Sequence, residues 1–355
     1  MTKKRISVGL LGATGAVGQR YVDMLEGHPF ISLDVLMGGE SAGKRYGEAV
    51  RWLFPDAIPE RLAGERVRKA VPASAEGCDV VFSALPSEVA GGIEQEFAGA
   101  GLTVVSEAST HRMDADVPLV IPEINADHLK LLKAQPKKRG WRGAIATTPN
   151  CTVTGLAMVL KPLVDQFGAE KAIVTTMQAL SGAGYPGVPS LAITENVLPY
   201  IKNEEEKVAR EAKKILGTLR GGVVEQNGIA MGVSCNRVQV IDGHTETLYA
   251  EFSRRVDPQE VAAALSEFRG RPQELKLQTA PERPIIVRTE SDRPQPRLDR
   301  MAGTVPGMSV TVGRVRRGID DRSLQLTLLS HNTIRGAAGQ AILATELMER
   351  EGYIG

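Results

Sequence analysis

Short runs of apolar residues alternate, over the first 110 positions, with stretches whose apolar positions recur three or four residues apart. The first pattern predicts buried strands and the second predicts helices. The predicted strands are Ile6–Leu11, Ile31–Met37, Asp79–Leu85 and Leu102–Ser109, and the predicted helices are Val17–Leu25 and Val89–Ala98. Strands that alternate with helices in this way favour a parallel, doubly wound sheet.

The pattern changes after Cys151, where the strand-like segments become longer and alternate apolar with polar residues. The predicted strands are Ala172–Gly182, Asn227–Val240, His244–Phe252, Met308–Arg317 and Ser323–Ser330, and the predicted helices are Asn203–Leu216 and Pro258–Phe268. This mixture is typical of an α+β domain whose mostly antiparallel sheet leaves one face for solvent or for a second subunit. We also expect a surface loop at Pro136–Gly143 and a closing helix over Thr333–Glu351.

Length and composition indicate a globular protein of two domains. The 355 residues exceed what one core usually holds, and 42% of them are hydrophobic. Lys and Arg total 43 against 42 Asp and Glu, so no basic field favours nucleic acid or anionic lipid as a partner. No apolar run is long enough to cross a bilayer, and we find no signal-peptide pattern.

The cysteines and histidines give no sign of a disulfide framework or a metal site. Cys78, Cys151 and Cys235 are odd in number and widely spaced, and the five histidines lack metal-ligand spacing. Free thiols of this kind fit a reducing compartment, so we expect a cytoplasmic protein that holds no metal.

One of these cysteines stands at the start of a predicted helix, in the segment ATTPNCTVTGLAMVL of residues 146–160. The unpaired N–H groups and the positive dipole at a helix N-terminus favour a thiolate, which is the nucleophilic form of cysteine. Cys151 is therefore a candidate nucleophile. The alternative is a small, buried hydrophobic residue that happens to lie near a helix cap.

A glycine-rich turn joins the first predicted strand to the first predicted helix. The segment GLLGATGAVGQRY places Gly12, Gly15 and Gly18 at this turn. Glycines there permit close approach of a ligand, and the helix N-terminus suits a pyrophosphate. We therefore expect dinucleotide binding, with a purely structural turn as the alternative.

The end of the second predicted strand bears on which dinucleotide binds. Its sequence, MGGESAGKRY, offers Glu40 for the ribose hydroxyl of NAD and Ser41 and Lys44 for the 2′-phosphate of NADP. Both cofactors remain open on these residues alone.

A second group of reactive residues lies in CNRVQVIDGHTETLYAEF, where Arg237 and His244 are seven residues apart across a predicted turn. A histidine can act as an acid or base near neutral pH, and an arginine can hold a carboxylate through two hydrogen bonds. A surface hairpin with an ordinary salt bridge is the alternative. Gln178, at a predicted strand end, is either a donor to a reacting carbonyl or a simple polar terminus.

Taken together, these motifs resemble the aspartate-β-semialdehyde dehydrogenases of archaea and fungi. The resemblance covers essentially the whole chain. Its ordered motifs are GLLGATGAVGQRYV, FSALPSEVA, DVPLVIPEIN, PNCT, QALSGAGYPGVPSL, NRVQVIDGHTE, DRPQPRLDR and SHNTIRGAAG.

The resemblance implies a Rossmann-type doubly wound sheet in a dinucleotide-binding domain, formed by residues 1–150 plus 331–355. Residues 151–330 would form an α+β catalytic and dimerisation domain of a homodimer or homotetramer. The implied reaction reduces L-aspartyl-4-phosphate with NADPH to aspartate semialdehyde and phosphate, a step towards lysine, threonine and methionine. Cys151 would form a thioester intermediate, which divides one hard displacement into two easier ones.

The resemblance also implies roles for individual residues. His244 would be the acid or base beside Cys151, and Gln178 would orient the acyl group. The implied substrate-binding residues are Arg237 for the carboxylate, Glu204 for the ammonium group, and Lys207 and Arg112 for the phosphate. The implied cofactor-binding residues are Gly12, Thr14, Gly15, Ala16, Val17, Ser41, Lys44, Ser83, Ala84, Leu85, Gly182 and Asn332. Without the resemblance, KNEEEKVAREAKK would be an ordinary solvated helix face.

Departures from the family pattern leave two alternatives open. Glu107 stands where the family usually has asparagine, and a carboxylate near a bound phosphate would repel it. Gly38 and Glu40 replace a serine and an arginine that many members carry before SAGK, which weakens the expectation of NADP. Archaeal malonyl-CoA reductase, with the same cysteine, is therefore the second candidate, and a catalytically silent nucleotide-binding scaffold is the third.

Overall fold

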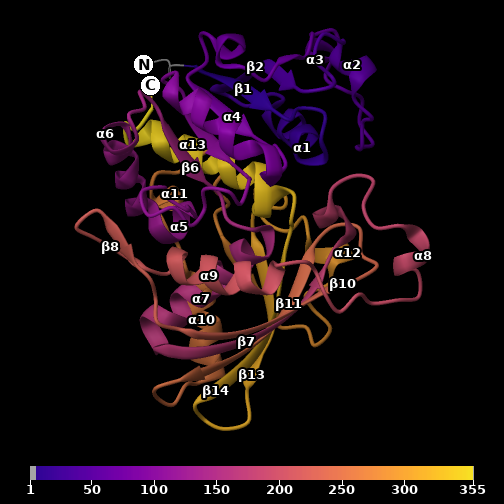
Figure 1. The fold of residues 1–355 in the computed structure, drawn as a ribbon. Helices are drawn as coiled ribbons and strands as arrows, with labels where there is room; N and C mark the ends of the chain where they lie inside the picture. Colours follow the sequence, from indigo (N-terminus) through magenta and orange to yellow (C-terminus); the bar gives the residue numbers. More distant parts are fainter. Residues whose placement is uncertain (1–4, 355) are drawn as a thin grey trace.

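The computed structural model describes residues 5–354 as two lobes, each built around a sheet (Figure 1). The upper lobe holds a six-stranded sheet in the order β3-β2-β1-β4-β5-β6, whose neighbouring strands all pair in parallel. Its strands are β1 (Ile6–Leu11), β2 (Ile31–Gly38), β3 (Arg68–Lys69), β4 (Val80–Ser83), β5 (Thr103–Ser106) and β6 (Ala144–Thr147). The predicted doubly wound parallel sheet is confirmed.

Two apolar clusters cover the faces of this sheet, because its strands are buried on both sides. Its α-helices are α1 (Ala16–Leu25), α2 (Tyr46–Ala49), α3 (Glu60–Ala63), α4 (Ser87–Gly99), α5 (Pro122–Asn125) and α6 (Gln135–Arg139). The 3₁₀ segments of this lobe are η1 (Pro72–Ala75) and η2 (Ala126–Ala134). The prediction of a surface loop at Pro136–Gly143 is wrong for the first half of this segment, which belongs to α6. This helix continues from η2 and ends at Gly140, whose backbone is left-handed.

The lower lobe contains a second six-stranded sheet, in the order β10-β7-β11-β14-β13-β12. Its strands are β7 (Ala169–Gln178), β10 (Ala230–Arg237), β11 (His244–Phe252), β12 (Ile285–Val287), β13 (Val310–Arg317) and β14 (Ser323–Ser330). The pairings β7–β11, β11–β14 and β13–β14 are antiparallel, whereas β7–β10 and β12–β13 are parallel. The sheet is mixed, with the antiparallel majority that the sequence predicts. A separate hairpin joins β8 (Thr218–Arg220) to β9 (Val223–Glu225).

Helices pack on one face of the second sheet, with α7 at the centre. These helices are α7 (Cys151–Phe167), α9 (Glu204–Ile215) and α10 (Pro258–Glu267); α8 (Ser190–Ile193), α11 (Arg271–Glu274) and α12 (Pro296–Asp299) are single turns in the connections. Most residues of α7 are buried, as the mostly apolar run from Val153 to Leu160 leads one to expect. Gly155 brings α7 close to β14, since a Cβ there would lie 2.7 Å from Cβ of Ser330.

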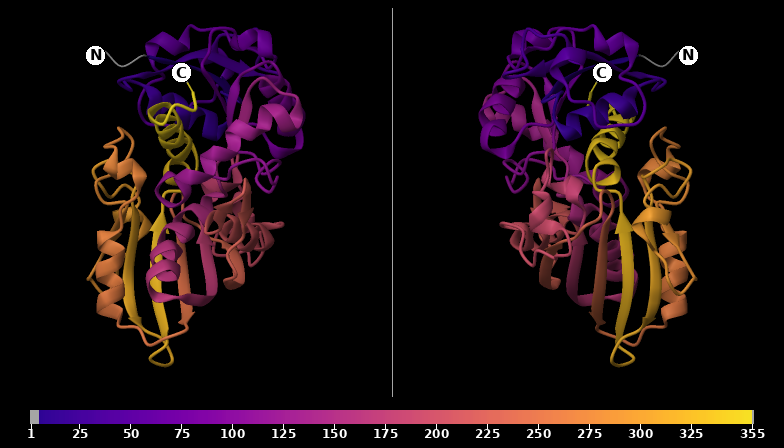
Figure 2. Two further views of the ribbon diagram at one scale, coloured as in Figure 1. Left: turned by 90° about the vertical axis from the view of Figure 1, so that its left-hand side faces the viewer. Right: turned by 90° about the vertical axis from the view of Figure 1, so that its right-hand side faces the viewer.

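The C-terminal segment returns to the upper lobe, where the yellow helix α13 (Gly339–Arg350) lies in all three views (Figures 1 and 2). Its residues Ile342, Leu343 and Leu347 join the core of the first sheet. The predicted single helix over Thr333–Glu351 is interrupted, because η4 (Ile334–Ala338) is a π-helical turn with non-helical dihedral angles at Ala337.

These two cores support the division that we propose, with residues 1–150 and 331–355 in one domain and 151–330 in the other. Residues 1–4 and 355 lie outside the described part of the chain. Each domain also contributes residues to the core of the other, since Leu119 and Ile121 pack in the core of the second sheet and Met308 packs in the core of the first.

One face of the second sheet is exposed, and it carries a shallow hollow lined by Ile173, Thr175, Thr247 and Gln325. Between residues 5 and 354, no helix has the length and apolar character that a membrane crossing demands.

Candidate active site

The thiol of Cys151 lies at the first residue of α7, where the two lobes meet. Asn150 caps the helix, since its side-chain oxygen accepts hydrogen bonds from the backbone N–H groups of Thr152 at 2.9 Å and Val153 at 3.4 Å. Sγ of Cys151 is 3.2 Å from Nε2 of His244, across 93 residues of sequence. The chain therefore brings the predicted nucleophile and its predicted partner into direct contact.

The charge state of this thiol differs from the sequence-based expectation. Burial raises the pKa of Cys151 to about 12, and the negative charge of Glu204 adds to this shift, whereas Arg112 and Arg237 oppose it. The expectation that the helix N-terminus keeps a thiolate is therefore wrong for this structure, because loss of solvent outweighs the favourable backbone dipoles. Burial therefore favours the protonated thiol over the thiolate.

His244 begins β11 and is fully buried. The backbone N–H of Ala179 donates to Nδ1 of His244 at 3.0 Å. Because Nδ1 accepts, the proton of the neutral ring sits on Nε2 and points at the sulfur of Cys151. Burial, followed by the charges of Arg237 and His331, lowers the pKa of His244 to about 3, so the ring is neutral near neutral pH. This geometry favours hydrogen-bond donation from Nε2.

Arg237 and Gln178 lie beside this pair on neighbouring strands, where they are register partners at the ends of β10 and β7. Arg237 donates from Nη1 to the backbone oxygen of Ala179 at 2.7 Å. Gln178 is buried, and its Nε2 has no hydrogen-bond partner among the described residues. An unpaired donor at this position suits an incoming carbonyl oxygen.

The surface-hairpin alternative for Arg237 and His244 is excluded by the sheet order, because β7 lies between β10 and β11. The loop after β7 forms the 3₁₀ turn η3 (Leu180–Ala183) and brings Gly182 against both side chains. A Cβ at Gly182 would lie 2.9 Å from Nη1 of Arg237 and 3.0 Å from Cε1 of His244. Gly182 therefore forms a wall of the Cys151 site.

Glu204, the carboxylate predicted to bind the ammonium group of the substrate, is the first residue of helix α9. Oε1 of Glu204 accepts a hydrogen bond from Nδ2 of Asn150 at 2.9 Å, next to Cys151. Lys207 follows one turn later and is half-buried. The negative charge of Glu204 and the positive charges of Arg112 and Arg237 all influence the pKa of the Cys151 thiol.

Arg112 is held by polar groups from the same region. Its Nη1 donates to Glu211 at 3.0 Å, its Nη2 donates to the backbone oxygen of Glu107 at 2.6 Å, and its Nε is buried with no partner among the described residues. Glu211 also accepts from the backbone N–H of Asn150 at 2.7 Å. No sequence pattern pointed to Glu211, which links Arg112 to the N-terminal cap of α7.

Glu107 does not face the site as a free carboxylate. Its side chain accepts hydrogen bonds from the hydroxyl groups of Tyr21 at 2.6 Å and Thr148 at 2.5 Å. Burial raises the pKa of Glu107 above its usual value, which favours the neutral form. The repulsion of phosphate that we expected from Glu107 is therefore relieved by the partners and burial of the carboxyl group.

The glycine turn is shaped by backbone contacts. Gly12 has a φ of +75°, and a Cβ on it would lie 2.7 Å from the backbone oxygen of Ala84. A Cβ on Gly18 would lie 2.2 Å from the backbone oxygen of Gly12, so both positions require glycine. Gly15 is exposed and leaves α1 without a side-chain cap, which keeps the helix N-terminus, with Thr14, Ala16 and Val17, open to a ligand.

The neighbouring strand end offers further groups that fit a dinucleotide. Ser83 is the last residue of β4, and Ala84 and Leu85 follow it. Strand β4 lies beside β1 where the strand order changes direction, and this is where such sheets bind nucleotides. The buried hydroxyl of Ser83 has no partner among residues 5–354. At the end of β2, Ser41 is half-buried and Lys44 and Glu40 are exposed, so all three are accessible to a ribose.

A cleft of about 570 Å³ runs between the lobes and is lined by Ala16, Arg20, Ser181, Arg300 and His331, among others. Asn332 supports one wall of this cleft, because its Oδ1 accepts from the N–H of Gly243 at 2.9 Å and its Nδ2 donates to Ser181 at 2.7 Å. Sequence reasoning missed His331, whose buried Nδ1 is without a hydrogen-bond partner in the described chain.

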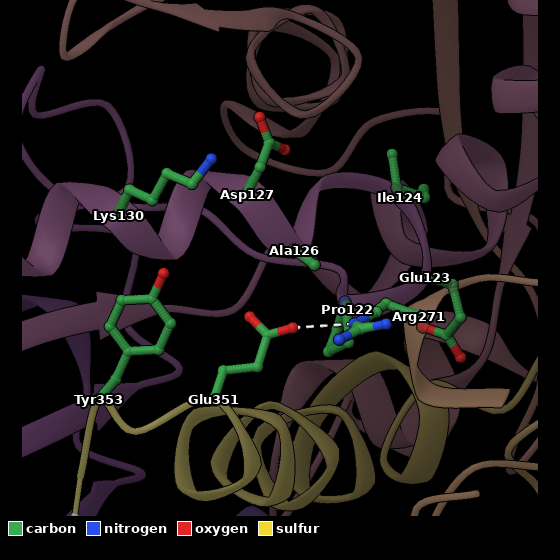
Figure 3. Close-up of a pocket in the computed structure, with 9 residues that line it drawn as sticks. All are labelled: Pro122, Glu123, Ile124, Ala126, Asp127, Lys130, Arg271, Glu351 and Tyr353. Carbon is green, nitrogen blue, oxygen red and sulfur yellow. Dashed lines mark hydrogen bonds and ion pairs between the residues drawn. The ribbon is translucent and has the colours of Figure 1, made fainter. Parts of the chain in front are cut away.

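A second hollow, of about 400 Å³, lies elsewhere (Figure 3). Arg271 and Glu351 form an ion pair across it at 2.9 Å, and Lys130 and Tyr353 lie at its other end. Among the described residues, its lining shares none with the Cys151 site. It is therefore not the candidate active site.

Two family models match the chain. They are described as "Semialdehyde dehydrogenase, NAD binding domain", over residues 7–132, and "Semialdehyde dehydrogenase, dimerisation domain", over residues 160–335. The chain is 51% identical to an aspartate-semialdehyde dehydrogenase of Archaeoglobus fulgidus, over 99% of this chain and 100% of that protein. It is 43% identical to a malonyl-CoA reductase (NADP) of Metallosphaera sedula, over 99% of both chains.

A solved structure has the same fold. The chain matches a crystal structure of aspartate semialdehyde dehydrogenase with NADP from Candida albicans with a TM-score of 0.89 and 39% identity. The match covers 98% of this chain and 100% of that chain.

Proposed function

The chain belongs to the aspartate-semialdehyde dehydrogenase family, and we propose that it catalyses the NADP-dependent conversion of L-aspartyl-4-phosphate to L-aspartate-4-semialdehyde and phosphate. The observation that carries this proposal is the contact between Sγ of Cys151 and Nε2 of His244, at 3.2 Å. The charges of Glu204, Arg112 and Arg237 also act at this thiol. A nucleophile placed between an arginine and a glutamate suits the carboxylate and the ammonium group of an amino-acid substrate.

In the proposed reaction, the sulfur of Cys151 forms a bond to the acyl carbon while the bond from that carbon to the phosphate oxygen breaks, and the departing phosphate takes up the proton that the thiol loses. The products of this step are a thioester and free phosphate. NADPH, when bound, supplies the hydride that converts the thioester into the aldehyde, and the sulfur recovers its electron pair as the carbon–sulfur bond breaks. His244 donates from Nε2 to the sulfur and holds this proton beside the carbonyl oxygen, towards which the unpaired Nε2 of Gln178 is also available.

The cofactor would occupy the cleft between the lobes. Its pyrophosphate fits the uncapped N-terminus of α1 at Gly15, and Ser83 offers an unpaired hydroxyl close by. Ser41 and Lys44 would receive the 2′-phosphate, and the similarity to a protein solved with NADP supports that preference. Glu40 remains available to a ribose hydroxyl, so NADH is the cofactor to test beside NADPH.

Glu204 favours an amino-acid substrate over malonyl-CoA. Its charge is the largest of the charge effects that raise the pKa of the Cys151 thiol, after burial itself. An ammonium group beside Glu204 would neutralise this effect and so favour the thiolate. Malonyl-CoA has no ammonium group and would leave Glu204 as an uncompensated charge near the reacting sulfur. The malonyl-CoA alternative therefore rests on sequence similarity to one relative.

Assays with both substrates test the proposal. The purified protein is mixed with aspartate semialdehyde, inorganic phosphate and NADP, and NADPH formation is followed by absorbance; malonyl-CoA with NADPH forms the parallel assay. We expect activity in the first assay, with NADP preferred to NAD. Activity with malonyl-CoA alone would show that malonyl-CoA, and not aspartyl phosphate, is the substrate. No activity in either assay would favour a catalytically silent nucleotide-binding scaffold.

We also propose a cytoplasmic homodimer or homotetramer that pairs through the exposed face of the second sheet around Ile173 and Thr247. A match to a model described as a dimerisation domain supports this assembly. Light scattering of the purified protein would report its mass, and Ile173→Arg should shift that mass towards the monomer.

A further inference from the structure

A buried ion pair stands behind the Cys151 site and takes no part in the proposed chemistry. Nη1 and Nη2 of Arg335 donate to the two carboxylate oxygens of Glu123 at 2.8 Å and 2.7 Å, and both side chains are completely buried. Nε of Arg335 has no partner among the described residues. Two parallel bonds of this kind fix the relative geometry of the elements that carry them.

The pair joins three elements that meet at the catalytic helix. Glu123 lies on α5 and Arg335 lies on the π-helical turn η4. Nη2 of Arg335 also lies 3.3 Å from Sδ of Met158, which is seven residues after Cys151 on the same side of α7. Glu123 belongs to the wall of the second hollow, at the end away from Lys130 and Tyr353 (Figure 3), but its carboxylate is turned into the protein.

The residue after Arg335 touches the nucleophile. A Cβ on Gly336 would lie 2.7 Å from Cβ of Cys151 and 2.8 Å from its Cα, so the backbone of Gly336 is packed directly against Cys151. The N–H of Gly336 donates to the backbone oxygen of His331 at 3.0 Å, which ties the same turn to the cleft wall. The position of η4 therefore decides how Cys151 is held opposite His244.

We propose that Glu123 and Arg335 are positioning residues for the reaction: their ion pair holds η4 against Cys151 and so keeps its sulfur aligned with His244. A buried ion pair is a poor source of stability, since apolar residues of similar volume often stabilise a fold equally well. Its two directed bonds instead provide a fixed geometry, and errors of about 1 Å in the placement of reacting groups cost on the order of 100-fold in rate.

The inference rests on the proposed reaction, and the test separates the two. Glu123→Gln weakens the ion pair and keeps the shape of the side chain. The matched control is Glu346→Gln, which weakens the buried contacts of Glu346 with His28 and Thr279, neither of which belongs to the Cys151 site. We measure kcat, KM, the melting temperature, and the rate at which iodoacetamide alkylates Cys151, read by mass spectrometry.

We expect Glu123→Gln to lower kcat at least tenfold with KM values within twofold of the parent, and to raise the alkylation rate of Cys151 at least threefold because a looser wall admits water. Glu346→Gln should lower the melting temperature and leave kcat and alkylation unchanged. An unchanged kcat and alkylation rate in Glu123→Gln would overturn the inference, as would equal changes in both variants. If neither substrate is turned over by the parent protein, the proposed function fails, whereas the alkylation rates still decide the inference.

A double variant separates the effect of the Glu123–Arg335 pair on the reaction from its effect on the stability of the fold. Glu123→Leu combined with Arg335→Met replaces the pair by apolar side chains of similar size, and we expect a melting temperature close to that of the parent with kcat lowered at least tenfold. Parent-like kcat in this folded variant would show that the pair only fills space. If the double variant does not fold, the result for Glu123→Gln decides.

Discussion

The cofactor turn and the Cys151 site are built in opposite ways. The turn is continuous in sequence, and backbone contacts at Gly12 and Gly18 give it its shape. The Cys151 site is assembled from the side chains of distant segments, as the 93 residues between Cys151 and His244 illustrate. We therefore expect the turn to lose its shape when a Cβ is added at Gly12 or Gly18. We expect the Cys151 site to lose its geometry when a side chain that contacts another element is removed.

The largest effect should come from the nucleophile itself. Cys151→Ser should lower the rate of semialdehyde oxidation by at least about 1,000-fold, because the hydroxyl cannot replace the thiolate. Binding of NADP, measured by calorimetry, should stay within about twofold of the parent. Loss of both properties would mean that Cys151 is structural, and the contrast between the two regions would disappear.

The turn offers the opposite experiment. Gly18→Ala places a Cβ 2.2 Å from the backbone oxygen of Gly12, so the turn must open. We expect NADP affinity to fall on the order of 100-fold and the free energy of unfolding to fall by about 1–3 kcal/mol, as overpacking usually costs. Gly92→Ala in α4 is the matched control, since nothing lies within 4 Å of the Cβ that it adds. Equal losses in both variants would remove the packing explanation.

Arg237→Lys tests the directed bonds of the substrate site. An ammonium group cannot reproduce the two parallel bonds of a guanidinium group, so KM for aspartate semialdehyde should rise on the order of tenfold to 100-fold. Cofactor affinity and the melting temperature should change little. A KM equal to that of the parent would take Arg237 out of substrate binding.

Glu204→Gln tests the electrostatics of the thiol with a pH profile. After burial, the charge of Glu204 is the next cause that raises the pKa of Cys151, so removing this charge should lower that pKa. A decrease of one unit makes alkylation by iodoacetamide about tenfold faster at any pH below the pKa. KM should rise in the same variant, because the ammonium partner is lost. A pH profile identical to that of the parent would contradict the assigned role of Glu204.

Sequence patterns predicted several strands to the residue, whether or not burial alternates along them, as β1 at Ile6–Leu11 shows. The bounds of β11 and β14 were predicted to the residue, because His244–Phe252 and Ser323–Ser330 carry a clear strand pattern between turn residues. The strand predicted over Ala172–Gly182 runs too far, since β7 ends at Gln178 and its last apolar residues form the turn that brings Gly182 to the site. The apolar residues Ala179 and Leu180 continue the strand pattern into the turn, so the pattern alone could not locate the end of β7.

The chemistry of the site was predicted by residue type, but its polar partners were not. The bond from Asn150 to Glu204 spans 54 residues, that from Arg112 to Glu211 spans 99, and that from Arg335 to Glu123 spans 212. Such pairs follow from packing in three dimensions and leave no local spacing in the sequence. Burial, followed by the charge of Glu204, raises the pKa of the Cys151 thiol, an effect that helix position alone did not predict.

The most direct test of the central claim is a single-turnover experiment without phosphate. The protein is mixed with aspartate semialdehyde and NADP, NADPH release is followed by absorbance, and the acid-quenched protein is analysed by mass spectrometry. The account predicts a burst of one NADPH per subunit and an aspartyl thioester on the peptide that contains Cys151, both absent from Cys151→Ser. NADPH formation without a burst, with no acyl group on Cys151 of the parent, would contradict it.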